Sequence, residues 1–207
     1  MNPLKTIGGT IIGGIVLAFI IMFATKGNHM VAVGGSVLSI TIWLHVLSGI
    51  TWIGLLYYFN FVQVPALGEA AGDEGGPGGA GIAKYVAPRA LAWFRWGALA
   101  TWLTGAAFLA HTPKVEFMTA FMLGMNTDPI NTYAMTIGVG AWLGTIMLFN
   151  VWVLIWPNQK KVLGMVEATA DEVAKAKNVA LLASRSNTLM SIPMVMSMVG
   201  AGHGWPM

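Results

Sequence analysis

The residue whose type and setting best suit chemistry is His45, an imidazole inside a long apolar stretch. Residues 43–54 read WLHVLSGITWIG. An ionisable side chain within a membrane span is costly and points to a functional site. On a helix, His45, Gly49 and Trp52 are spaced i, i+4 and i+7, so they share one face. A glycine one turn from the histidine leaves room for a flat ring system, and neutral imidazole is a good axial ligand for haem iron.

Two other interpretations of His45 stay open. A lone intramembrane histidine can hydrogen-bond across helices, with Gly49 as a close helix contact. It can also relay protons. A haem site needs a second axial ligand, for which His203 and His111 are the candidates, although taken alone each is more simply interpreted as an exposed loop histidine. The 14 methionines offer thioether ligands, but most fill the core.

A second polar cluster, residues 184–194, lies in the last apolar segment and reads SRSNTLMSIPM. Its side chains need partners inside a helix bundle. Asn187 and Ser191 share a helix face, and Pro193 bends the helix. Arg185 lies near the cytoplasmic end of the segment. Both Arg185 and Asn187 have two interpretations, structural packing or contact with an anionic substrate or a haem propionate.

Composition sets the frame for these side chains. Of 207 residues, 56% are hydrophobic and 9% are charged, whereas soluble chains carry roughly 25% charge. So few charges exclude an ordinary cytosolic enzyme, a nucleic-acid binder and a disordered chain. The absence of cysteine excludes disulfides, zinc–thiolate sites, iron–sulfur clusters and covalently attached c-type haem. A single all-α integral membrane domain over residues 1–207, embedded in the lipid bilayer, is the predicted fold class.

Five stretches are long enough to cross a membrane, which takes about 20 apolar residues. They cover about residues 7–25, 36–65, 90–110, 132–156 and 180–200. The fourth is expected to stop at Pro157, because proline cannot continue a helix interior. Residues 115–125 are a candidate short interfacial helix. Residues 160–178 carry mixed charges and are predicted to form an amphipathic helix at the membrane surface.

Basic residues orient these spans. Nine of the 11 lysines and arginines fall on one side of a five-span topology, namely Lys5, Lys84, Arg89, Arg95, Lys160, Lys161, Lys175, Lys177 and Arg185. The positive-inside rule then places the N-terminus in the cytoplasm and the C-terminus in the periplasm. All four histidines, His29, His45, His111 and His203, fall in the outer half of this arrangement.

Three of these segments resemble a known family. Residues 156–161 (WPNQKK), residues 184–193 and the H-x-x-x-G-x-x-W-x-G pattern from His45 to Gly54 resemble the urate oxidase N-terminal (membrane-bound urate hydroxylase) family. His203 matches a histidine that follows the family's last helix. The resemblance covers roughly residues 36–204. It implies a multi-pass protein of the bacterial inner membrane that is linked to electron transfer.

In the urate hydroxylases a cytochrome c domain follows the membrane part. This sequence ends at Met207 and has no cysteine, so any c-type haem is expected in a separate partner. A periplasmic cytochrome c would approach from the side of the histidines.

Three hypotheses follow. The first is a subunit that binds b-type haem through His45, with Gly49, Trp52, His203 and His111 as the other candidate site residues, and relays electrons within a larger respiratory or photosynthetic complex. The second is a urate or purine hydroxylase-like oxidoreductase, in which Arg185 and Asn187 hold the substrate and a partner cytochrome c accepts electrons. The third is a cofactor-free structural accessory subunit.

Overall fold

The computed structural model describes residues 2–26 and 33–204. All regular elements in these ranges are helical, which confirms the predicted all-α class. Contacts between residues divide the chain into two compact units, Met1–Val37 and Leu38–Met207. Composition, by contrast, predicts a single domain. Each unit is described by itself.

The first unit holds the 3₁₀-helix η1 (Pro3–Lys5) and α1 (Ile7–Lys26). The side chain of Asn2 caps η1 by accepting a hydrogen bond from the backbone N–H of Leu4, at 2.9 Å. The large apolar side chains of α1 are exposed within the unit, Ile20 at 58% and Phe23 at 68%. A helix that is apolar all round suits a lipid environment.

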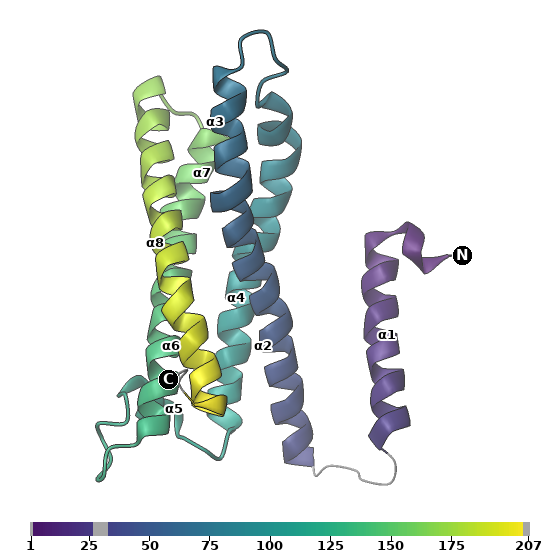
Figure 1. Cartoon of the computed structure of the whole chain (residues 1–207), viewed down its shortest axis with the longest axis vertical. Helices are drawn as coiled ribbons and strands as arrows, with labels where there is room; N and C mark the ends of the chain where they lie inside the picture. The colour runs from purple at the N-terminus through teal and green to yellow at the C-terminus, as the bar shows by residue number, and fades with distance from the viewer. Residues whose placement is uncertain (1, 27–32, 205–207) are drawn as a thin grey trace. The chain divides into compact units, whose positions relative to one another are not determined.

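The second unit is an up-and-down bundle (Figure 1). Its elements are α2 (Val33–Tyr58) from Leu38 onward, η2 (Phe59–Gln63), α3 (Val64–Gly72), η3 (Ile82–Val86), α4 (Ala87–His111), α5 (Phe117–Phe121), α6 (Thr132–Phe149), η4 (Asn150–Ile155), α7 (Trp156–Val162) and α8 (Ala170–His203). The core joins α2, α4, η4 and α8 through residues such as Trp52, Leu56, Phe94 and Val151, each at most 2% exposed. A smaller cluster, which includes Leu109, Ala120 and Ile137, packs α5 against α4 and α6. The short helix α5 lies within the predicted interfacial segment 115–125.

Three π-helices carry the chain past prolines, one of which, Pro157, is predicted to end a span. η2, η3 and η4 each end just before a helix with proline at one of its first two positions, Pro65, Pro88 and Pro157. A proline ring clashes with the carbonyl four residues earlier. That carbonyl belongs to Phe61, Lys84 or Val153, each inside the preceding π-helix. The wider turn relieves the clash, so the predicted stop at Pro157 is wrong and helical structure continues to Val162.

Three helical segments of the described residues are long and apolar enough to cross a membrane, by length and composition. They are Ile7–Ala24, Val37–Gly72 and Thr132–Val162. Helices α4 and α8 are long as well, at 25 and 34 residues, but charged side chains such as Arg95 and Lys175 lower their hydropathy. Five spans and the orientation stay predictions.

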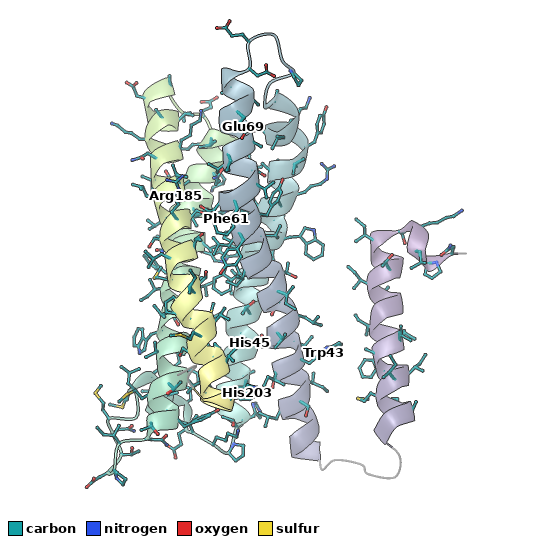
Figure 2. All side chains as sticks on the ribbon, viewed as in Figure 1. Trp43, His45, Phe61, Glu69, Arg185 and His203 are labelled. Atoms are coloured by element: carbon teal, nitrogen blue, oxygen red, sulfur yellow. The ribbon has the colours of Figure 1, made fainter. Side chains whose placement is uncertain are left out.

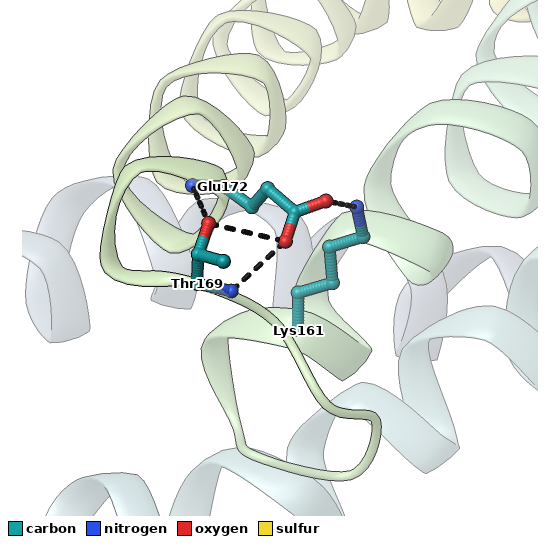
Figure 3. Close-up of polar contacts among 3 residues, drawn as sticks. All are labelled: Lys161, Thr169 and Glu172. Atoms are coloured by element: carbon teal, nitrogen blue, oxygen red, sulfur yellow. Dashed lines mark hydrogen bonds and ion pairs between the residues drawn. The ribbon is translucent and has the colours of Figure 1, made fainter.

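The predicted surface helix at 160–178 is divided differently in the structure. Helix α7 ends at Val162, and α8 begins at Ala170 and runs without a break through the last predicted span. A capping box starts α8 (Figure 3). The N–H of Thr169 donates to a Glu172 carboxylate oxygen at 2.9 Å, and the N–H of Glu172 donates to Oγ1 of Thr169 at 3.3 Å. Nζ of Lys161 lies 3.7 Å from the other carboxylate oxygen, so α7 and α8 meet at this cap.

This cap makes part of the stability depend on pH. The backbone hydrogen bond from Thr169, its hydroxyl and Lys161 lower the pKa of Glu172 below its ordinary value of 4.5. A carboxyl with a lowered pKa in the folded state stabilises above its unfolded pKa, and this contribution disappears as the pH falls through the folded value. We therefore expect Glu172→Gln to lower the melting temperature slightly at neutral pH, and the difference from the wild type to vanish as the pH falls from 4.5 through the lowered pKa. Thermal unfolding of the Glu167→Gln variant, which changes an exposed glutamate, is the control. An equal pH dependence of the melting temperature in both variants would contradict a specific contribution from Glu172.

Candidate functional site

A largely apolar cavity of about 390 Å³ opens between α2, α4, α6 and α8. This volume lies within the range of sites for small molecules and cofactors. Its walls are rich in glycine and alanine, including Gly105, Gly140 and Gly144. These small residues come from α4, α6 and α8. The polar side chains at the cavity include His45, Lys114, Tyr133 and His203.

His45 is held in one orientation by α4. Its Nδ1 lies 2.8 Å from the carbonyl oxygen of Thr101. A carbonyl can only accept, so Nδ1 carries the proton and, in the neutral ring, Nε2 keeps a free lone pair. This is the arrangement that orients metal-ligating histidines. The ring packs on Gly105, where an added Cβ would lie 2.9 Å from Cε1 and 3.0 Å from Nδ1.

The two residues predicted beside His45 have different places. Trp52 is 2% exposed and lines the cavity, and its indole N–H is buried without a hydrogen-bond partner among the described residues. Gly49 faces α4, where its Cβ position lies 3.8 Å from the Thr101 methyl, and it does not line the cavity. The glycine that makes room for the His45 ring is thus Gly105, on the neighbouring helix.

The other histidines differ in their access to this cavity. Figure 2 shows His45 and His203 toward the same end of the bundle, away from Glu69. His203 is the last residue of α8, is exposed and lines the cavity. His111 ends α4, but its Nδ1 donates to the carbonyl of Ala107 on its own helix at 2.8 Å, and it is not among the lining residues. His29 lies outside the described residues.

Two cavity residues were missed by the sequence analysis. Lys114 follows the end of α4, and its Nζ lies 5.6 Å from the ring centroid of Tyr133, near the start of α6. Both line the cavity. The sequence signal for Lys114 is a basic residue next to a predicted outer span end, on the side that holds the histidines. The cavity therefore combines an apolar body with a cationic and phenolic edge.

Arg185 and Asn187 do not converge on one site. Asn187 is fully buried and satisfied, since its Oδ1 accepts from Asn150 at 2.8 Å and its Nδ2 donates to the carbonyl of Met147 at 3.0 Å. Arg185 is exposed on α8. The 18 residues from Arg185 to His203 span roughly 27 Å at 1.5 Å per residue. Asn187 thus joins α8 to α6 and η4, as the packing interpretation predicts.

The side chains at the cavity that could ligate a metal are imidazoles rather than a cluster of carboxylates. Across residues 2–26 and 33–204, no group of three or more histidines and acidic residues is placed to hold a metal ion. The free Nε2 of His45, the unpaired indole N–H of Trp52 and the apolar glycine-lined walls fit a flat, largely apolar group with polar substituents.

Comparison with curated proteins and with solved structures gives no match. One family model matches: residues 114–207 match the family described as urate oxidase N-terminal, which confirms the resemblance over that part of the chain. The matched segment contains α5, α6, η4, α7 and α8. It includes Lys114, Tyr133, Asn187 and His203, whereas His45 precedes it.

Proposed function

We propose that this protein is a five-span subunit of the bacterial inner membrane that binds b-type haem in the cavity, near the periplasmic face. It relays electrons within a larger respiratory or photosynthetic complex. The observation that carries the proposal is the hydrogen bond from Nδ1 of His45 to the Thr101 carbonyl, because it leaves Nε2 available as an axial ligand at the wall of an apolar cavity.

Other cavity residues support the same group. His203 reaches the cavity and is the better candidate for the second axial ligand, because His111 bonds to its own helix. Lys114 and Tyr133 offer an ammonium and a phenol to the propionate carboxylates. When bound, the haem would supply one-electron chemistry. The chain's own residues would orient it, exclude water from its faces and balance its negative charge.

The electron partner would approach from the end that holds His203 and Lys114. Both side chains are exposed there, and the predicted topology turns this end toward the periplasm. A periplasmic cytochrome c therefore suits the proposal as the soluble partner.

A pyridine-haemochrome spectrum of the isolated chain tests the proposal. A b-type alpha band, with a Soret band that shifts on reduction, is the expected result. A chain that inserts into membranes and co-purifies with a stoichiometric complex, but carries no haem, would replace this proposal with the structural accessory role.

The family match favours a second candidate, a urate or purine hydroxylase-like oxidoreductase that passes electrons to a partner cytochrome c. The placement of Arg185 and Asn187 gives that pair no common substrate site. Urate consumption by membranes that contain the chain, with and without added cytochrome c, distinguishes this activity from electron relay alone.

A further inference from the structure

One aromatic ring at the opposite end of the bundle from the cavity carries two cations. The Arg95 guanidinium, from α4, lies with Cζ 3.8 Å from the ring centroid of Trp156 in α7. Nζ of Lys160, one turn further along α7, lies 5.9 Å from the same centroid. Two helices thus bring two positive charges to one indole.

Neither cation has an acidic partner in the part of the chain that the structure describes. The one ion pair there joins Lys161 to Glu172. A guanidinium has five N–H donors, and those of Arg95 make no hydrogen bond to another of the described residues. Two like charges beside one indole repel each other, and a bound anion would relieve the repulsion.

The surroundings of Arg95 are those of a membrane interface. Trp93 and Trp96, on either side of it in the sequence, are each 56% exposed. Trp96 also packs edge-on against Trp152 of η4, with ring centroids 5.3 Å apart. Exposed indoles gather at the headgroup level of a bilayer. The predicted orientation assigns this end to the cytoplasmic leaflet, whose lipids carry negative charge.

We propose that Arg95 and Lys160, gathered on the indole of Trp156, bind the phosphate of an anionic phospholipid in the cytoplasmic leaflet. Arginine suits phosphate because its planar fork can donate two parallel hydrogen bonds, and Lys160 adds a second charge. The inference rests on the membrane placement in the proposed function but not on the haem, so the haemochrome spectrum does not bear on it.

Lipid titration of the full chain tests the site. The protein is purified in a mild detergent after carbonate extraction has verified membrane insertion, and phosphatidylglycerol or phosphatidylcholine is added. Lipids retained per chain are counted by native mass spectrometry. We expect the wild type to prefer phosphatidylglycerol, and Arg95→Gln to bind it about tenfold more weakly, a loss of about 1.4 kcal/mol. Arg185→Gln, which removes an exposed arginine from α8, is the matched control and is expected to keep the preference.

Lys160→Gln keeps the Arg95–Trp156 contact and is expected to weaken phosphatidylglycerol binding as well, so the test does not depend on the folding of the Arg95 variant. Equal lipid preference in the wild type and both site variants would overturn the proposal. Full competition by inorganic phosphate would also overturn it, because the site would then bind a small anion rather than a lipid. Failure of carbonate extraction would remove the membrane placement itself, whatever the haem content.

Discussion

His45→Ala is expected to lower the haem content per chain at least tenfold while the protein still inserts into the membrane. Among the described residues, His45 is the one imidazole that a neighbouring helix holds at the cavity wall, with Nδ1 bonded to Thr101 and Nε2 free. Changes that merely disturb the orientation of a metal ligand cost about 10–100-fold in affinity, so loss of the ligand itself should cost no less. The alpha band and the pyridine-haemochrome yield, divided by the amount of inserted protein, give the measurement.

His111→Ala is the matched control, because this histidine lies at the same end of the bundle but bonds to its own helix. It is expected to retain the wild-type haem content. Gly105→Ala gives an intermediate test, because it displaces the imidazole of His45 without removing it. The new methyl group would lie 2.9 Å from the His45 ring. An unchanged alpha band in His45→Ala would show that iron is held elsewhere, and the Thr101 bond would then be a helix contact between α2 and α4.

Gly138→Ala is expected to destabilise the fold by about 1–3 kcal/mol, the usual cost of overpacking. Gly138 lies in α6 where α5 packs most closely. An added Cβ would collide with the carbonyl oxygen of Ala120 and would lie 3.0 Å from a methyl group of Leu123. Ala120 is fully buried, so its backbone has no free space into which to move. Denaturant unfolding in detergent, followed by circular dichroism, gives the free energy of unfolding.

Gly54→Ala serves as the control for helix propensity, because a Cβ at that exposed position of α2 meets nothing within 4 Å. Alanine is favoured over glycine in a helix by roughly 0.5–1 kcal/mol, so this variant should be neutral or slightly more stable. Equal losses in the two variants would contradict the close contact between α5 and α6. The displaced α5 in Gly138→Ala would also disturb Phe121, which lines the cavity.

Much of this architecture could be predicted from composition and pattern. With 9% charged residues and long apolar stretches, the chain must bury its backbone polar groups within helices, and every regular element described is helical. Alternation of direction between successive helices follows from short connections. This predicts His45, His111 and His203, far apart in the sequence, at one end of the bundle. Figure 2 shows His45 and His203 toward the same end, and His111 is the last residue of α4.

Helix ends near proline could not be predicted, because the outcome depends on the turn that precedes the ring. Pro157 removes a hydrogen bond in any context, but the π-helix η4 accommodates it and the helical path continues to Val162. The same holds for Pro65 after η2. Local propensity gives the free-energy cost of a proline inside a helix. Packing of the neighbouring turns in the bundle decides whether the helix ends there.

What the sequence by itself determined is therefore the all-helical class, the apolar segments and the end of the bundle at which the imidazoles gather, because these depend on hydropathy and chain direction. Only the tertiary structure decided which side chains meet. Rotation and register between α2 and α4 put Gly105, and not Gly49, against the His45 ring, and they bury Trp52 at the cavity wall. Packing of α8 on α6 likewise buries Asn187 and leaves Arg185 exposed. Periodicity along one helix defines its faces, but the neighbour that each face meets is set by contacts between residues distant in the chain.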